Sequence, residues 1–336
     1  MIKHLILIIL LFFMGVAIVP AQTLPKMRIS VENTETHFQT RAVKRFADDI
    51  REKLKGRIDV QFFSNAQLLR DIDVIQALGQ GRVEMAVPGT WNIVQFEPDV
   101  GVFLLPVFYG RTAYDNYLIL DSAMGGAING KIEKNLQLKV LGQWIDLGYA
   151  HLFGVNKKIK RHEDIQGLRI RVAGGTANKL RIQALGGHPV IIPWPDLPEY
   201  MQQGKVDGIL TSYETVKSAK LWENGVRYVF EDQEYFPQYI PLIRASFWEK
   251  LTPDIQILLT ETWKENVDAA RLSAAEAQKE AKEILIKNGV EIVVPEPLQM
   301  EKWRNRMLLL QDEFIRELRI DPELVRQINA VFKGNE

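Results

Sequence analysis

An arginine near the end of an apolar strand is the side chain in this sequence best suited to bind an anion. Residues 168–172 alternate apolar and basic residues as a strand does, residues 174–175 are glycines that interrupt the pattern, and residues 178–185 have helical spacing. The guanidinium group of Arg171 is a planar fork that pairs with both oxygens of a carboxylate. The pattern around Arg171 therefore predicts a binding site for a carboxylate. Arg169 lies on the same face of the strand, so the alternation alone does not show which of the two arginines binds it.

The elements around Arg171 follow the order strand, helix, strand, helix, strand. After the first strand and helix come a strand at residues 189–192, a helix opened by Pro195 and Asp196, and a strand at residues 206–210. Strands connected by helices in this way run parallel, and ligands bind beyond their carboxyl ends. The same order begins near the N-terminus, so the two halves of the chain are predicted to be alike. Those N-terminal elements are expected at residues 26–32, 36–54, 57–63 and 83–87.

Three blocks of residues, in a fixed order and spacing, carry a resemblance to a known family. They are residues 164–172, 185–190 and 196–208. The chain resembles the solute-binding proteins of tripartite ATP-independent periplasmic (TRAP) transporters, the DctP family. The N-terminal half carries further parts of the pattern, so the resemblance covers nearly the whole mature chain. These parts are His37 with Phe46 and Ala47, Gln67 with Leu68, residues 81–84 and residues 105–108.

The resemblance implies an α/β fold of two lobes, the type II-like fold of periplasmic binding proteins, with hinge strands and a long helix joining the lobes. The implied lobes are residues 22–148 with 237–275 and residues 149–236 with 276–336. The residues alone also predict the long helix. Thr252 and Pro253 begin it, and no proline or glycine follows until Gly289. A helix of about 36 residues is roughly 54 Å long, about the span of two small domains.

The resemblance also implies a ligand site in the cleft between the lobes, with Arg171 as the principal carboxylate anchor. Trp194 stands where the family often has a pocket aromatic, and Trp91 beside Thr90 has the matching place in the first lobe. An indole offers a flat apolar wall and one N–H donor. Core packing explains such a tryptophan equally well. Thr211 stands where many members have a polar residue that contacts the ligand.

Two departures from the family pattern leave the far end of the ligand open. Residues 209–214 lack the common Glu-x-Pro ending, so Tyr213 or Glu214 could face the cleft as well as Thr211. The second departure concerns an arginine that binds ligand in many members. Counting back from Arg171 puts His151 at its position.

His151 could make ligand binding depend on pH, since imidazole titrates near neutral pH. A single histidine near a strand is more often a hydrogen-bonded structural residue. One extra residue after Gly148 would instead put Ala150 at the arginine position, and the site would then have no second cation. The sequence leaves both alternatives open.

The N-terminus has the pattern of a secretory signal. Lys3 and His4 precede an apolar run at residues 5–19, and Ala21 offers a small residue for cleavage. The run is shorter than the ~20 residues that span a bilayer as a helix. We therefore expect a signal peptide at residues 1–21 and a periplasmic mature protein, with an uncleaved N-terminal anchor as the alternative.

Composition and missing motifs exclude several classes of function. The 42 basic and 42 acidic residues cancel, so the net charge does not indicate binding to nucleic acid. Cysteine is absent, and the sequence contains no H-E-x-x-H, G-x-S-x-G or Walker A motif. None of the five histidines forms an i, i+4 pair. We therefore expect no catalytic residues, no metal site and no cofactor.

The residues and the resemblance together predict a binding protein. It would capture a small organic acid in the cleft, close over it, and deliver it to a small and a large integral membrane subunit of a transporter. We expect it to act as a monomer. The alternative is a ligand sensor that presents the same closed form to a membrane receptor kinase. The sequence does not identify the acid.

Overall fold

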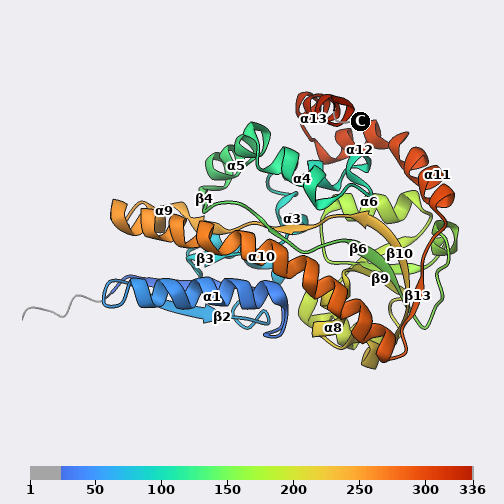
Figure 1. Cartoon of the computed structure of the whole chain (residues 1–336), viewed down its shortest axis with the longest axis horizontal. Coiled ribbons are helices and arrows are strands. Elements are labelled where there is room, and N and C mark those ends of the chain that lie inside the picture. The colour runs from blue at the N-terminus through green and yellow to red at the C-terminus, as the bar shows by residue number, and fades with distance from the viewer. Residues whose placement is uncertain (1–23, 335–336) are drawn as a thin grey trace, which may run out of the picture.

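Two mixed β-sheets, each flanked by helices, form the two lobes of the protein (Figure 1). The computed structural model describes residues 24–334, and the signal peptide predicted at residues 1–21 lies outside them. The first sheet has the order β2 (Asp59–Phe63), β1 (Lys26–Ser30), β3 (Met85–Ala86), β12 (Leu242–Arg244), β4 (Leu138–Val140). The second has the order β13 (Glu291–Val293), β10 (Val226–Tyr235), β6 (Ala150–Val155), β9 (Gly208–Thr211), β7 (Arg169–Val172), β8 (His188–Ile191). This confirms the predicted α/β fold.

Both sheets contain the parallel strands that the sequence pattern predicts. β1 pairs in parallel with β2 and β3, and β7 pairs in parallel with β8 and β9. In each lobe the first strand of the run therefore lies between the second and the third, so the two halves are alike as expected. The connecting helices are α1 (Phe38–Lys53) and α2 (Val74–Gly79) in the first lobe, and α6 (Thr176–Ala184) and α7 (Leu197–Gln202) in the second.

A two-stranded ribbon lies where the chain passes between the sheets. It consists of β5 (Ile145–Asp146) and β11 (Gln238–Tyr239), which pair antiparallel. β5 leads from the first sheet into β6, and β11 follows β10 on the way back to β12. The ribbon therefore carries the chain in both directions, as hinge strands do.

The predicted long helix is α10 (Pro253–Lys287), which has 35 residues and a length of roughly 52 Å. It runs along both lobes (Figure 1). Near its start Glu265 pairs with Lys53 of α1 at 2.9 Å. Near its end the side-chain oxygen of Gln278 accepts a hydrogen bond from the backbone N–H of Glu214 at 3.0 Å. One helix thus spans the two sheets, which confirms the prediction made from its length.

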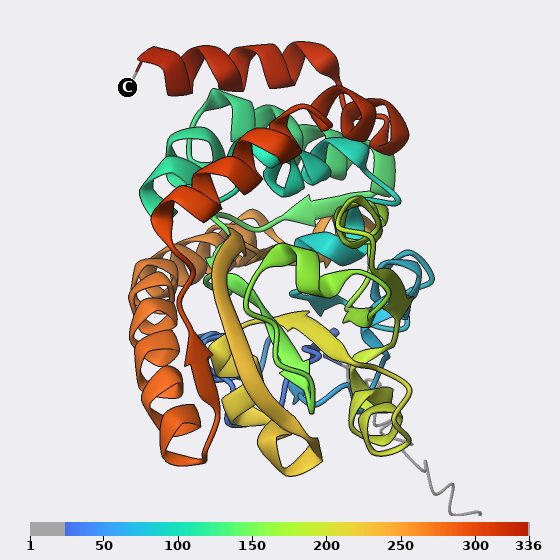
Figure 2. The same ribbon diagram turned by 90° about the vertical axis from the view of Figure 1, so that its right-hand side faces the viewer.

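The C-terminal helices pack over the helical segment that follows β3 (Figure 2). The ring of Phe332 meets that of Phe108 edge-on at 5.3 Å, and the backbone N–H of Val107 donates to the side chain of Gln311 at 2.8 Å. The chain end therefore contacts a segment assigned to the first lobe, and the lobe boundaries stay a prediction. The helices here are η2 (Pro98–Leu104), η3 (Pro106–Phe108), α4 (Ala113–Leu120), α5 (Ala123–Leu136), α11 (Pro297–Leu308), α12 (Gln311–Leu318) and α13 (Pro322–Gly334).

Short helices complete the chain and carry several residues of the cleft. They are η1 (Asp71–Asp73), α3 (Thr90–Ile93), η4 (His162–Ile165), η5 (Trp194–Asp196), α8 (Tyr213–Ser218), η6 (Leu221–Asn224) and α9 (Ala245–Trp248). Within residues 24–334, no helix is both long enough and apolar enough to cross a membrane.

Candidate functional site

A small cavity between the lobes lies at the carboxyl ends of strands from both sheets. Glu32 and Asn33 follow β1, Arg171 lies on β7 and Thr211 ends β9, and all four line the cavity. This is where ligands bind in parallel α/β sheets. The cavity has a volume of about 30 Å³, which is room for about two water molecules. A larger ligand can enter only if the surrounding groups move apart.

Arg171 is a buried cation with no carboxylate at contact distance among the described residues. Its side chain belongs to a residue that is 2% exposed, and its Nε and Nη2 atoms both donate to the carbonyl oxygen of Ile192, at 3.1 and 2.9 Å. Among the described residues, no carboxylate oxygen lies within 4.0 Å of this guanidinium, and no protein acceptor is found for Nη1. Arg181 is equally buried but lies 3.2 Å from a carboxylate oxygen of Glu234. A guanidinium held at one edge and unpaired at the other is suited to bind an anion.

Arg169, which the strand pattern could not separate from Arg171, has a different role. It is exposed, and its Nε and Nη2 atoms donate to the two carboxylate oxygens of Asp207 at 2.9 and 3.1 Å. This bidentate pair ties β7 to the residue just before β9. Arg169 is therefore fully occupied on the surface, and Arg171 is the arginine that lines the cavity.

Two carboxyl groups share the cavity with Arg171. Both oxygens of Asp71 accept from the backbone N–H of Trp194 at 3.2 Å, and Glu32 accepts from the side-chain amide of Asn92 at 3.4 Å. Removal from water raises the pKa of Asp71, and Arg171 opposes this. Removal from water, together with the charge of Asp71, raises the pKa of Glu32 well above its usual range. The same burial lowers the pKa of Arg171, against the pull of both acids.

Sequence reasoning missed both acids. The signal for Glu32 was available, because it ends the strand expected at residues 26–32, at the edge where ligands bind. Asp71 had no such signal, since it lies on the short helix η1 between elements. Tyr235 and Tyr239, which also line the cavity, belong to the strands β10 and β11.

Four of the predicted site residues come together at the cavity. Trp91, Trp194 and Thr211 line it along with Arg171, and each of these three is less than 9% exposed. The ring of Trp91 meets that of Tyr239 edge-on at 5.5 Å. Its indole N–H is buried and has no acceptor among the described residues. The cleft therefore has two aromatic walls, one from each lobe, as the sequence suggested.

Thr90 and Tyr213 do not line this cavity. Thr90 is 1% exposed at the start of α3, beside Trp91, and is not among the residues that line the cavity. The ring of Tyr213 packs against those of His151 and Phe153 at 5.0 and 5.6 Å. Tyr213 and His151 instead line a separate groove of about 870 Å³ beside α10.

Of the two residues considered for the position of the family's second arginine, Ala150 lines the cavity and His151 does not. The Nδ1 atom of His151 accepts from the backbone N–H of Gln233 at 3.1 Å and lies 3.9 Å from Asp232. Arg171 is thus the one cation among the described residues that line the cavity. His151 does not line it, so we do not propose that His151 contacts the ligand.

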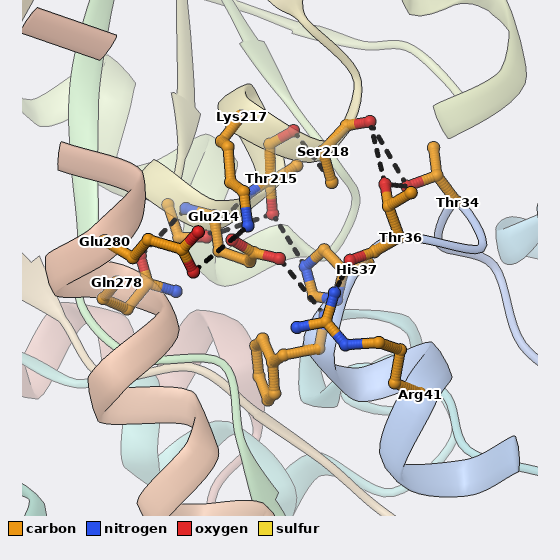
Figure 3. A network of polar contacts seen from close by, with 12 residues as sticks. Thr34, Thr36, His37, Arg41, Glu214, Thr215, Lys217, Ser218, Gln278 and Glu280 are labelled. Atoms are coloured by element: carbon orange, nitrogen blue, oxygen red, sulfur yellow. Dashed lines mark hydrogen bonds and ion pairs between the residues drawn. The ribbon is translucent and has the colours of Figure 1, made fainter. Parts of the chain in front are cut away.

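Polar contacts cross between the lobes beside the cavity (Figure 3). They join the segment from the end of β1 to the start of α1 with the helix α8. The Nε2 atom of His37 lies 3.4 Å from the hydroxyl of Thr215, and the backbone N–H of Phe38 donates to Glu214 at 3.2 Å. On another side of the cavity Asp71 binds the backbone of Trp194. These contacts hold the lobes together in the conformation described.

His37 serves both as a helix cap and as a contact between the lobes. It is the N-cap of α1, and its Nδ1 atom accepts from the backbone N–H of Gln39 at 3.2 Å. This bond assigns the ring proton to Nε2, which donates to Thr215. Burial, helped by the charges of Arg41 and Lys217, lowers the pKa of His37 to about 3. The bond accepted by Nδ1 requires the neutral ring, because a protonated Nδ1 has no free lone pair.

Comparison with known families gives one match over most of the chain. The model of the family described as "Bacterial extracellular solute-binding protein, family 7" (DctP) matches residues 29–317. The C4-dicarboxylate-binding protein DctB of Bacillus subtilis is 26% identical over 270 residues, which are 79% of this chain and 75% of that protein. The 2,3-diketo-L-gulonate-binding periplasmic protein YiaO of Escherichia coli is 23% identical over 324 residues, 96% of this chain and 97% of that protein.

Solved structures share the fold. A TRAP periplasmic solute-binding protein from Shewanella oneidensis with bound succinate superimposes with a TM-score of 0.84 at 19% identity, over 92% of this chain and 99% of that one. The sugar acid binding protein DctPAm from Advenella mimigardefordensis in complex with galactonate superimposes with a TM-score of 0.86 at 20% identity, over 93% and 99%. Both support the two-lobed architecture.

Proposed function

Because the chain belongs to the bacterial extracellular solute-binding proteins of family 7, we propose that it captures a small organic carboxylate between its lobes and delivers it to the membrane subunits of a TRAP transporter. The family is one of binding proteins, so the chain is a binding protein and not an enzyme. The relatives and solved structures named above bind dicarboxylates, a diketo sugar acid or other organic acids, and all of these ligands are carboxylates.

The observation that carries this proposal is the unpaired guanidinium of Arg171. An ionised group that is removed from water costs several kcal/mol unless an opposite charge compensates it. Arg181, which is just as buried, has Glu234 at 3.2 Å for this purpose. Arg171 donates to a carbonyl oxygen and has no carboxylate oxygen of the described residues within 4.0 Å, so Asp71 and Glu32 attract its charge only from a greater distance. A carboxylate that enters the cavity would supply the missing charge and accept two hydrogen bonds in parallel.

Closure of the lobes over the ligand is part of the proposal. We assign residues 22–148 with 237–275 to the first lobe and residues 149–236 with 276–336 to the second. The ribbon of β5 and β11 would act as the hinge, and α10 would connect the lobes along one side. Support comes from the cavity, which is lined from both lobes and is too small to admit an organic acid without movement.

The proposal also places the protein in the periplasm as a monomer. The observations that support this location are the short apolar run at residues 5–19 with Ala21 after it, and the extracellular description of the family. Cleavage would follow Ala21, and the partners would be one small and one large integral membrane subunit. Mass analysis of the secreted protein tests the cleavage site directly.

Two matched variants test the role of Arg171. Arg171→Met keeps the apolar stem and removes the charge, and Arg169→Met does the same for the neighbour that pairs with Asp207. Loss of a buried, hydrogen-bonded charge pair costs about 2–5 kcal/mol, so the dissociation constant for the bound acid should rise by roughly 30- to 5,000-fold in Arg171→Met. Arg169→Met should change it by less than about threefold, since a pair on the surface contributes little.

The assay is calorimetry on the mature protein, with a bound acid first found by thermal shift against a panel of organic acids. A ligand at a thousand times its dissociation constant adds about 4 kcal/mol to stability, which such a screen detects. Equal effects of the two variants would contradict the assignment of Arg171. Recovery of a chemically changed acid would contradict a binding role.

A further inference from the structure

The groove beside α10 is a second, larger space that is separate from the cavity. It is lined by Tyr117 of α4, Asp146 and Phe236 of the chain segments at the hinge, and Leu272 of α10, and we call it the hinge groove. Its volume of about 870 Å³ lies in the range of small-molecule sites, roughly 300–1,000 Å³. The hinge segments lie between the two spaces, since Leu147 lines the cavity and Asp146 beside it lines the groove.

The walls of the hinge groove offer aromatic and aliphatic surface. The rings of Tyr149 and Phe236 meet edge-on at 5.2 Å, and both residues line the groove. On the opposite wall Leu272 of α10 is 70% exposed, and Ala275, about one turn later, is exposed as well. A leucine so exposed in the middle of a long helix has apolar surface that a ligand can cover. The groove is therefore suited to the apolar or aromatic body of a small molecule.

Two of the basic side chains in the groove are already paired. The Nη1 and Nη2 atoms of Arg271 donate to the two carboxylate oxygens of Asp121 at 2.6 and 3.0 Å. The Nζ atom of Lys282 lies 2.6 and 2.7 Å from the two carboxylate oxygens of Glu231. These pairs cancel each other's charge, so they do not determine the charge of a ligand.

Two further carboxylates in the groove have no cation at contact distance. Asp146 is 2% exposed, and its Oδ2 atom accepts a hydrogen bond from the hydroxyl of Tyr117. Its Oδ1 atom has no partner within 3.5 Å in the described part of the chain, although Arg271 and Gln238 attract its charge from farther away. Burial raises the pKa of Asp146 to about 6, so the group is still mostly ionised at pH 7.5. Asp268 is exposed on α10 and lines the same groove.

The remaining basic side chain lies at the other end of the groove. Lys279 is exposed and comes eleven residues after Asp268 on α10, which is roughly 16 Å along the helix. It also comes eight residues after Arg271, which is close enough to Asp146 to influence its pKa. Between residues 24 and 334, the end of the groove near α4 therefore has more negative than positive charge.

We propose that the hinge groove is a second binding site, which takes an organic cation with an apolar or aromatic body. The charge of the cation would be attracted to Asp146 and Asp268, and its body would pack against Tyr149, Phe236 and Leu272. The faces of the two aromatic rings also attract a cation. The charge of this ligand is opposite to that of the carboxylate proposed for the cavity. The site does not depend on the proposed function, and a molecule bound there would contact both lobes and the hinge.

Three probes of similar size test the charge that the groove prefers. Phenethylammonium is a cation, 2-phenylethanol is neutral and 2-phenylethanesulfonate is an anion, and all three carry the same phenyl ring. Calorimetry on the mature protein at pH 7.5 should show one phenethylammonium bound per chain. The affinity should exceed that for 2-phenylethanol by about tenfold or more, since a hydrogen bond to a charged group contributes about 1.5–3 kcal/mol. The sulfonate should bind more weakly than the alcohol.

Matched variants test where the cation binds. Asp146→Asn keeps the shape of a buried carboxylate and removes its charge, so it should weaken phenethylammonium binding by about tenfold or more. Asp268→Asn removes an exposed charge and should weaken binding by about two- to fivefold. Glu261→Gln removes another exposed carboxylate of α10, one that does not line the groove, and should leave the affinity unchanged. Ala275→Trp should abolish binding, because the indole would fill the groove from an exposed position.

Each result supports or contradicts the second site. Phenethylammonium that does not bind, or that binds no more tightly than the alcohol or the sulfonate, would show that the groove is not a site for cations. Binding that survives Ala275→Trp, or that Glu261→Gln weakens as much as Asp268→Asn, would place the cation elsewhere. If Asp146→Asn does not fold, the two exposed positions on α10 still decide the matter. Carboxylate binding to the cavity is measured with separate ligands, so the proposed function stands or fails independently.

Discussion

Replacing His37 by asparagine should change how the stability of the protein depends on pH. Asparagine is a good N-cap, so its side-chain oxygen can keep the role of Nδ1 toward the backbone N–H of Gln39. It cannot take up a proton, and it is too short to replace the Nε2 bond to Thr215. The variant therefore removes the titration of His37 and one contact between the lobes, and it leaves the helix cap in place.

The magnitude follows from the pKa of His37, which burial lowers from 6.5 to about 3. The unfolded chain then binds a proton that the folded protein does not. The stabilisation from the neutral ring is fully present above pH 6.5 and is lost as the pH falls from there toward 3. Between pH 8 and pH 5 the loss is about 2 kcal/mol for a group that shifts by this much. The bond to Thr215 at 3.4 Å contributes about 1 kcal/mol at most.

His37→Asn should therefore be less stable than the unmodified protein at pH 8 and more stable at pH 5. Urea unfolding at the two pH values measures this, and the difference between the proteins should move by about 2 kcal/mol in favour of the variant. Buried acids with raised pKa values, such as Glu214 and Glu234, change stability in the opposite direction. They are present in both proteins and cancel in the comparison.

His188→Asn, which replaces an exposed histidine, is the control and should leave the pH dependence as it is. A direct check is the NMR titration of the histidine rings, in which the signal of His37 should not move between pH 8 and pH 5. A parallel loss of stability in His37→Asn and the unmodified protein, or a His37 signal that titrates near 6.5, would refute this account of the contact.

Two further substitutions address the packing around the cleft. Arg181→Met should lower the free energy of unfolding by about 1–3 kcal/mol in urea titrations, because it leaves the buried acceptors on Tyr109, Asn178 and Leu104 without their donor. A variant of unchanged stability would contradict this. Gly89→Ala should weaken ligand binding in calorimetry, because its Cβ would lie 2.2 Å from the ring of Trp91. Gly126→Ala, where nothing lies within 4 Å, is the control that should bind normally.

The fold could be predicted from the sequence because its signals are local. Strand alternation, glycine turns and helix starts lie within a few residues of one another, and they placed the parallel strands of both lobes within about two residues of their observed ends. The start of α10 was equally clear from Thr252 and Pro253. The contacts of α12 and α13 were not predictable in this way, since they join the chain end to residues about 200 positions earlier, as in the bond from Val107 to Gln311.

The site was predictable only where its residues follow a strand of the recognised pattern. Arg171, Trp194 and Thr211 do, and the structure brings them together. The choice between Ala150 and His151 depended on one extra residue, and only the structure shows that Ala150 lines the cavity while His151 does not. Local patterns do not contain that information. Local patterns also gave no sign of Asp71, which lines the cavity only because the two lobes meet there.

The charges of the cleft explain why closure would depend on the ligand. The contacts of His37 with Thr215 and of Phe38 with Glu214 join the lobes whatever the cavity contains, so they stabilise the closed form without selecting a ligand. In the conformation described, Arg171 is 2% exposed and has no carboxylate within 4.0 Å among the described residues. If closing the lobes buries this side chain, the desolvation would oppose closure. An anion that pairs with Arg171 would offset this desolvation cost only in the closed form, where the ion pair is shielded from water. The ligand would therefore bind the closed form more tightly than the open one, and this difference is what a ligand needs in order to shift a conformational equilibrium.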